Sequence, residues 1–132
     1  MLSVKTGDTE YLSRALRIAA KGMYTTHPNP RVGCVLVKRG RVIGEGYHLR
    51  AGEEHAEAIA LKMAGDQADG CTAYVTLEPC SFKGRTPSCA LALIKAGVKR
   101  VVSAMKDPDP RNAGAGHKIL QEAGIQVTTP LL

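Results

Sequence analysis

The feature that most constrains the fold is an alternation of strand-like and helix-like segments along a chain of 132 residues. Segments rich in Val and Ile alternate with segments whose apolar residues recur at helical spacing, and glycine and proline clusters separate them. Such alternation is typical of a sheet that carries helices on both faces. The sequence therefore predicts the α/β class, and within it a three-layer α/β/α sandwich.

The expected elements follow from the apolar spacing and from the glycines and prolines at their ends. Helices are expected at residues 9–21, at 55–63, from Pro87 to a stop at Gly97, and at 118–123; strands are expected at 33–38, 41–48, 73–77, 100–104 and 125–127. The first two strands are joined through Arg39 and Gly40, which favours a hairpin and makes the sheet mixed. Residues 107–116, rich in glycine and proline, are expected to form a connecting loop.

Length and composition indicate a single domain spanning residues 1–132. The apolar fraction of 44% and the charged fraction of 23% are ordinary for a globular protein. No apolar run approaches the roughly 20 residues that a membrane-spanning helix needs, and the first ten residues lack the pattern of a secretory signal. The cytoplasm is therefore the expected location.

The chain is basic, with 18 Lys and Arg against 12 Asp and Glu and a net charge of +6. This excess favours a phosphorylated or polyanionic partner without identifying it. Four Tyr, one Phe and no Trp leave few rings on which successive bases could stack. The composition thus argues against a protein that binds single-stranded nucleic acid.

The chemistry is concentrated in four residues, which are His55, Glu57, Cys80 and Cys89. One imidazole and two thiolates are three zinc ligands, and three protein ligands leave the fourth tetrahedral position open to water. An open position is typical of catalytic zinc. Glu57 follows His55 by two residues at the start of an expected helix, so its carboxylate can reach that water and act as general acid and base.

Two further cysteines could in principle close a structural zinc site. Cys34 lies at the start of an expected buried strand, and Cys71 precedes another. Cysteine in such positions usually behaves as a small apolar side chain. We therefore expect both to be packing residues.

The order of these residues resembles a known family. Zinc-dependent nucleobase deaminases combine His-x-Glu with a later Pro-Cys and a further Cys. Eight residues separate Cys80 from Cys89, and this longer loop resembles the deaminase domain of the bifunctional deaminase/reductases of riboflavin biosynthesis, in the cytidine-deaminase-like superfamily. The blocks that carry the resemblance are Thr26-His27-Pro28-Asn29-Pro30, Val32-Gly33-Cys34, Gly44-Glu45-Gly46-Tyr47-His48, His55-Ala56-Glu57, Thr76-Leu77-Glu78-Pro79-Cys80-Ser81, Gly84-Arg85-Thr86-Pro87 and Asp107-Pro108-Asp109-Pro110.

The resemblance implies a zinc-dependent hydrolase that removes an exocyclic amine from the diamino-ribosylamino-pyrimidinone 5′-phosphate of riboflavin biosynthesis. It also implies that Asn29 and His48 hold the pyrimidine ring and that Arg85 meets the phosphate side, a role that suits a guanidinium. Phe82 and Asp109 depart from the family pattern, which leaves the substrate contacts near them open. The family's reductase domain is absent from this sequence, so a separate or missing reductase partner is expected.

Two alternatives remain open from the sequence. Deaminases of other bases, acting on cytidine or on an adenosine of transfer RNA, share the metal motif, although the longer loop argues against them. A basic nucleic-acid-binding module with structural zinc is the non-enzymatic alternative, and salt-dependent binding without ammonia release would favour it. A homo-oligomer is compatible with the resemblance, and a membrane partner is not expected.

Overall fold

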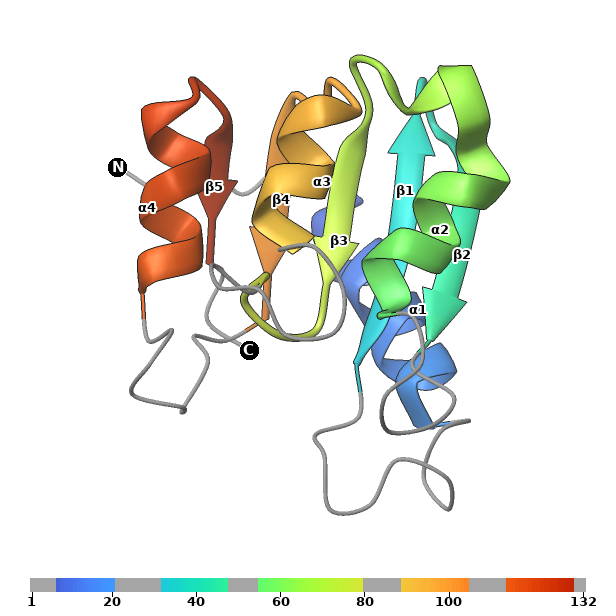
Figure 1. Ribbon diagram of the computed structural model, residues 1–132. Coiled ribbons are helices and arrows are strands. Elements are labelled where there is room, and N and C mark those ends of the chain that lie inside the picture. Colours follow the sequence, from blue (N-terminus) through green and yellow to red (C-terminus); the bar gives the residue numbers. More distant parts are fainter. Residues whose placement is uncertain (1–6, 21–31, 48–54, 80–88, 105–113, 130–132) are drawn as a thin grey trace.

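Five strands form one mixed sheet with helices on both of its faces (Figure 1). The computed structural model describes residues 7–20, 32–47, 55–79, 89–104 and 114–129. In chain order the elements are α1 (Asp8–Ala19), β1 (Gly33–Lys38), β2 (Arg41–Tyr47), α2 (Ala56–Ala64), the short 3-10 helix η2 (Gly65–Ala68), β3 (Thr72–Val75), α3 (Cys89–Lys95), β4 (Arg100–Ser103), α4 (Ala115–Glu122) and β5 (Gln126–Thr128).

The strand order is β2-β1-β3-β4-β5. Strand β1 runs antiparallel to both β2 and β3, whereas β3, β4 and β5 are parallel to one another. At the tip of the β1–β2 hairpin, Arg39 and Gly40 have φ angles of 53° and 76°. These left-handed conformations are the ones that a tight two-residue hairpin turn requires. The predicted hairpin and mixed sheet are confirmed.

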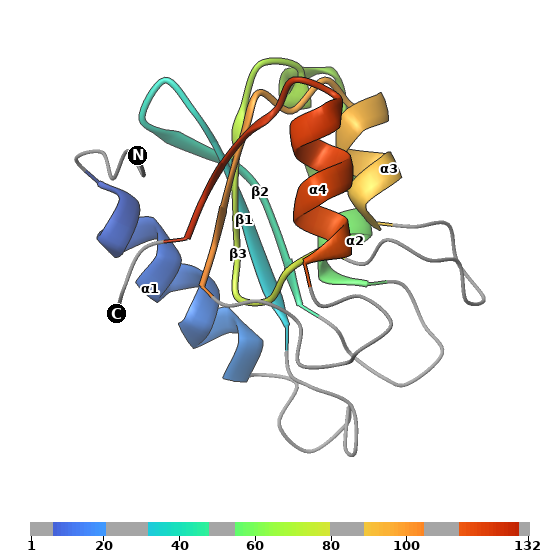
Figure 2. The same ribbon diagram turned by 90° about the vertical axis from the view of Figure 1, so that its left-hand side faces the viewer.

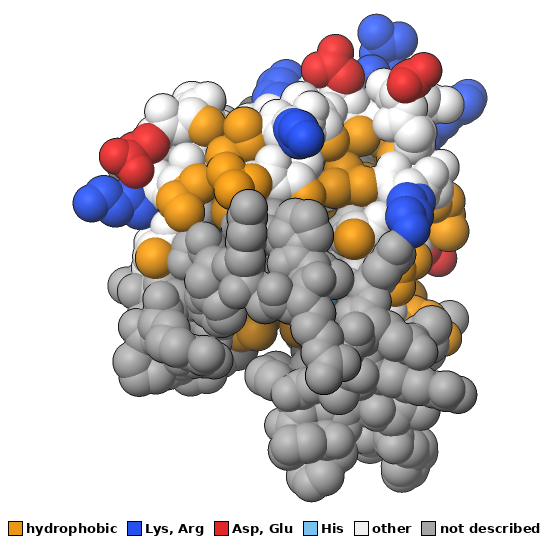
Figure 3. Space-filling view, in the orientation of Figure 1, with side chains coloured by type: hydrophobic (Ala, Val, Ile, Leu, Met, Phe, Trp, Pro, Cys, Tyr) orange, Lys and Arg blue, Asp and Glu red, His pale blue; other side chains and the backbone are white. Residues whose placement is uncertain are grey.

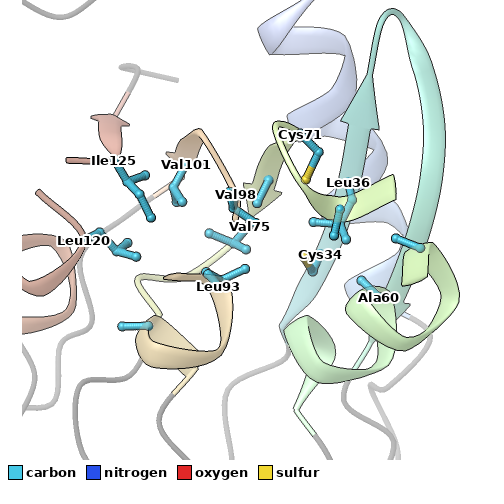
Figure 4. Close-up of a cluster of buried hydrophobic side chains, with 14 of the residues drawn as sticks. Cys34, Leu36, Ala60, Cys71, Val75, Leu93, Val98, Val101, Leu120 and Ile125 are labelled. Atoms are coloured by element: carbon cyan, nitrogen blue, oxygen red, sulfur yellow. The ribbon is translucent and has the colours of Figure 1, made fainter. Parts of the chain in front are cut away.

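The layers are also those predicted, because α1 covers one face of the sheet and α2, α3 and α4 cover the other (Figure 2). Strand β1 is buried along almost its whole length, as expected for a central strand covered on both faces. The larger core lies between the sheet and the three helices and includes Leu36, Val75, Leu93 and Leu120 (Figure 4). A smaller core containing Leu12 lies under α1.

The outer surface of the three-helix layer mixes apolar with charged side chains (Figure 3). Met63 on α2 and Leu91 on α3 are 63% and 46% exposed. None of the helices in the described ranges is long and apolar enough to cross a membrane.

The predicted ends of the elements differ from the observed ends by up to three residues. Helix α1 begins and ends one or two residues earlier than predicted, and β3 occupies residues 72–75 instead of 73–77. The largest error is at α4, which begins at Ala115 although the sequence predicts a start at Lys118 and a loop through Gly116. Glycines at 114 and 116 give no helical signal, and the group that caps this helix comes from a distant part of the chain.

Candidate active site

One edge of the sheet brings the predicted zinc-site elements together. Strands β3 and β4 are parallel and both end at this edge, and β1, antiparallel to β3, begins there. Helices α2, α3 and α4 all start at the same edge (Figure 1). In open α/β sheets, ligands bind beyond the carboxyl ends of the parallel strands. This edge is therefore where the fold places a functional site.

His55 and Cys89 meet at this edge although 34 residues separate them in sequence. His55 is the residue that precedes α2, with an extended backbone and a side chain that does not cap the helix. Its Nδ1 atom lies 3.0 Å from the Sγ atom of Cys89, the first residue of α3. Two such ligands on tetrahedral zinc stand about 3.5 Å apart, given bonds near 2.0–2.1 Å to nitrogen and 2.3 Å to sulfur. The two atoms would therefore need to move only slightly apart to bind the same zinc ion.

Glu57 occupies the first turn of α2 and is only 3% exposed. A carboxylate at this position is favoured by the positive end of the helix dipole. Its charge also reaches the sheet beneath: the pKa of the Cys34 thiol on β1 is raised, first by burial and then by the negative charge of Glu57. Glu57 thus lies on the interior side of α2, two residues after His55 in the sequence.

Cys34 and Cys71 are packing residues, as predicted. Both are fully buried in the larger core among aliphatic side chains (Figure 4). Burial raises the pKa of Cys71 to about 11, as expected for a thiol packed among apolar side chains. Cys71 also precedes β3 and lies at the opposite edge of the sheet from Cys89. It is therefore remote from the place where a structural zinc site would need a fourth ligand.

The remaining predicted site residues lie outside the described residues. These are the third zinc ligand, Cys80, and the substrate contacts Asn29, His48 and Arg85. Phe82 and Asp109, which depart from the family pattern, also lie outside them. Their roles stay predictions.

Two residues at this edge, Thr76 and Glu78, accept hydrogen bonds that are not evident from sequence spacing, because the partners lie more than 30 residues apart. The Thr76 hydroxyl, just after β3, accepts a hydrogen bond of 3.0 Å from the backbone N–H of Gly33. Beyond it, the Glu78 carboxylate accepts hydrogen bonds from the backbone N–H groups of Gly114 at 2.8 Å and His117 at 2.9 Å. The sequence signal that could have singled out both residues is their position in the Thr-Leu-Glu-Pro-Cys block.

Comparison with known sequences identifies similar proteins. Residues 5–105 match the family model for the "Cytidine and deoxycytidylate deaminase zinc-binding region". The chain is 62% identical over 125 residues to the riboflavin biosynthesis protein RibD of Escherichia coli, covering 95% of this chain and 34% of that protein. It is 52% identical over 125 residues to the diaminohydroxyphosphoribosylamino-pyrimidine deaminase of Buchnera aphidicola subsp. Acyrthosiphon pisum, covering 95% of this chain and 85% of that protein. The chain thus spans about a third of the RibD relative's length.

Solved structures show the same similarity. Acinetobacter baumannii RibD superposes with a TM-score of 0.91 at 56% identity, over 92% of this chain and 34% of that one. The Rib2 deaminase of Aspergillus oryzae, solved in complex with DARIPP, superposes with a TM-score of 0.76 at 25% identity, over 95% of this chain and 84% of that one. The sheet and its two helical layers are therefore shared with solved deaminases.

Proposed function

Because the chain belongs to the cytidine and deoxycytidylate deaminase family, among its diaminohydroxyphosphoribosylaminopyrimidine deaminases, we propose that it deaminates the diamino-ribosylamino-pyrimidinone 5′-phosphate of riboflavin biosynthesis. The reaction consumes water, releases ammonia and leaves the corresponding amino-ribosylamino-uracil phosphate. The observation that carries the proposal is the convergence of His55, Cys89 and Glu57 at one sheet edge in a chain that covers 85% of a deaminase of that name.

His55 and Cys89, together with Cys80, are proposed to hold a zinc ion. The matched family model describes a zinc-binding region, and the 3.0 Å approach of His55 Nδ1 to Cys89 Sγ supports this assignment. When bound there, zinc supplies the Lewis acid that makes water nucleophilic near neutral pH. Three protein ligands leave one position for that water, so the site is proposed to be catalytic and not merely structural.

Glu57 is proposed to move the protons of the reaction. Its carboxylate takes a proton from the attacking water and gives it to the ring nitrogen next to the reacting carbon. It then transfers the second proton to the departing amine, which leaves as ammonia. The role is supported by the burial of Glu57 in the first turn of α2, two residues after the proposed metal ligand His55.

Substrate recognition is proposed to fall to Asn29 and His48 for the pyrimidine ring and to Arg85 for the phosphate. The support is the resemblance of their sequence blocks to the family, together with the basic balance of the chain. A reductase that uses the product, on a separate protein or on a further part of a longer chain, is the proposed functional partner. We place the reaction in the cytoplasm, because a phosphorylated substrate does not cross a bilayer unaided.

The test is ammonia release by the zinc-loaded protein. The diamino-ribosylamino-pyrimidinone 5′-phosphate, cytidine and a transfer RNA are compared under identical conditions. We expect release from the phosphorylated pyrimidine alone. Release only from cytidine or transfer RNA would overturn the assigned substrate while keeping the zinc chemistry, and salt-dependent binding of nucleic acid without any ammonia would overturn the enzymatic proposal.

A further inference from the structure

A single carboxylate caps the start of α4 from outside the helix. The first N–H groups of a helix have no partner within it, and Gly114, the residue before α4, has no side chain with which to bond them. The two oxygens of Glu78 take this role instead, Oε1 accepting from the N–H of Gly114 and Oε2 from that of His117. These are the two positions that a capping box fills with two side chains of its own segment.

The same turn of α4 also touches the segment that leads to Cys80. A Cβ atom placed on Gly116 would lie 1.8 Å from the carbonyl oxygen of Pro79, so the helix backbone is in direct contact with that peptide. Only a glycine allows this approach. The first turn of α4 is thus joined to the Glu78-Pro79 segment by two hydrogen bonds and by close backbone packing.

A second link holds this turn to the neighbouring strand. Nε2 of His117 lies 2.9 Å from the hydroxyl oxygen of Ser103, the last residue of β4. Glu78, Ser103 and His117 are all buried, with exposures of 2%, 0% and 8%. Because buried polar groups are costly unless bonded, the arrangement specifies one position for the turn and for the segment that it contacts.

We propose that Glu78 is a positioning residue for the proposed zinc site: by tying the Glu78-Pro79 segment to the first turn of α4, it fixes the residues that directly precede the predicted ligand Cys80 in the sequence. It acts through the backbone, because both of its oxygens bond the N–H groups of α4. The inference rests on the proposed function, since it takes Cys80 as a ligand. It extends that function by making the α4 turn part of the metal site's support.

Glu78→Gln is the direct test. A glutamine has one oxygen that can accept a hydrogen bond, while its NH₂ group can only donate, so one N–H of the α4 turn would face another donor. We expect zinc release to a chelating dye to become at least about tenfold faster, as when groups that support metal ligands are removed. We also expect kcat to fall with KM changed by less than about threefold, because the substrate contacts are untouched.

Two further variants separate positioning from general loosening. Leu120→Ala weakens α4 through its buried core side without touching Glu78 or Pro79, and it should lower the melting temperature while zinc release stays near the parental rate. Gly116→Ala keeps the carboxylate but pushes against the Pro79 carbonyl, and it should speed zinc release as Glu78→Gln does. Gly116→Ala also serves as the test if Glu78→Gln does not fold.

The outcomes distinguish this inference from the proposed function. A parental rate of zinc release in Glu78→Gln, or equally fast release in Leu120→Ala at a matched loss of melting temperature, would overturn the positioning role while leaving ammonia release by the parent intact. A parent protein that neither retains zinc nor releases ammonia would overturn both.

Discussion

At the scale of single residues, the proton-transfer role proposed for Glu57 can be separated from zinc binding. Glu57→Gln removes the proton carrier and keeps the size of a side chain that is 3% exposed. We expect zinc to be retained at the parental stoichiometry and turnover to fall by at least about a hundredfold, as for the loss of a general acid and base. Atomic absorption and ammonia release measure the two quantities.

Glu122→Gln provides the matched control for Glu57, because this glutamate is exposed at the end of α4. Its turnover should equal that of the parent. Near-parental turnover in zinc-loaded Glu57→Gln would contradict the proton-transfer role, whereas loss of zinc from it would indicate that the carboxylate supports the metal.

Cys71 connects one residue to the pH dependence of stability. Burial raises the pKa of its thiol from 9.0 to about 11 in the folded protein. A pKa raised by folding means that the thiol loses its proton at lower pH in the unfolded chain than in the folded one. The contribution of Cys71 to the free energy of unfolding is therefore fully present below pH 9 and is lost as the pH rises toward 11. The pKa of Tyr74 is also raised, by burial and then by its hydrogen bond to Asp8, which adds a loss of the same sign at higher pH.

Cys71→Ala should therefore flatten the alkaline loss of stability. Urea unfolding of parent and variant at pH 8 and pH 10.5 gives the comparison, with the change in unfolding free energy between the two pH values as the readout. The variant should lose less than the parent over this interval, whatever its stability at pH 8. Equal losses would mean that the Cys71 thiol does not titrate differently on folding.

At the scale of elements, two glycines allow α2 to lie directly on β2. A Cβ atom on Gly44 would stand 2.3 Å from the carbonyl oxygen of Ala60, and one on Gly46 would stand 2.7 Å from that of Ala56. Gly46 therefore faces the start of α2, which carries His55 and Glu57, and Gly44 faces the middle of the helix. A side chain added at either glycine would therefore push against α2, close to the proposed metal ligand His55 at Gly46 and farther from it at Gly44.

Gly46→Ala and Gly44→Ala form a matched pair. Each should lower the free energy of unfolding by about 1–3 kcal/mol, the usual cost of overpacking. Gly46→Ala should in addition lower turnover and zinc retention more than Gly44→Ala, because it displaces the turn that holds His55. Thermal unfolding measures the loss of stability, and titration of bound zinc measures its retention. Equal zinc retention in both variants would show that the start of α2 moves with the rest of the helix as a rigid body.

The elements also show where sequence patterns succeed and fail. The β1–β2 hairpin is predictable because its strands and its Arg39-Gly40 turn are local signals, and α2 is predictable because Gly65 ends it. The start of α4 is not predictable from spacing, because its cap is Glu78, which lies 36 residues before Gly114. Local signals thus define the elements, and long-range contacts determine some of their ends.

At the scale of the whole molecule, the proposed zinc site also depends partly on local sequence signals and partly on long-range contacts. The residue types and their spacing predict a zinc-binding set, since imidazole and thiolate are zinc ligands in any fold. The approach of His55 to Cys89 depends on α2 and α3 starting at one sheet edge, which no local pattern states. The sequence therefore predicts the chemistry, and the crossover connections of the sheet provide the proximity.

A buried ion pair ties α1 to the sheet that it covers. Asp8 at the start of α1 accepts hydrogen bonds from both terminal nitrogens of Arg100 on β4, at 2.9 and 2.7 Å, and from the Tyr74 hydroxyl on β3 at 2.7 Å. Asp8 and Arg100 are 0% and 2% exposed. The hydrogen bond to Asp8 is the main cause that raises the pKa of Arg100. Arg100 begins β4 and so lies at the edge of the sheet opposite His55 and Cys89.

This position predicts that stability and catalysis can be separated. Asp8→Ala leaves a buried guanidinium without its charge partner and should lower the free energy of unfolding by about 3–5 kcal/mol, whereas Asp8→Ala combined with Arg100→Met should cost much less than the two single changes added together. Urea unfolding of the parent, the two single variants and the double variant gives the four free energies of this double-mutant cycle. Because the pair lies at the far edge of the sheet, each folded variant should keep the parental kcat at a temperature well below its melting point. Strictly additive losses would show that the pair does not act as a unit, and a lowered kcat in a fully folded variant would show that α1 controls the geometry of the proposed zinc site through the sheet.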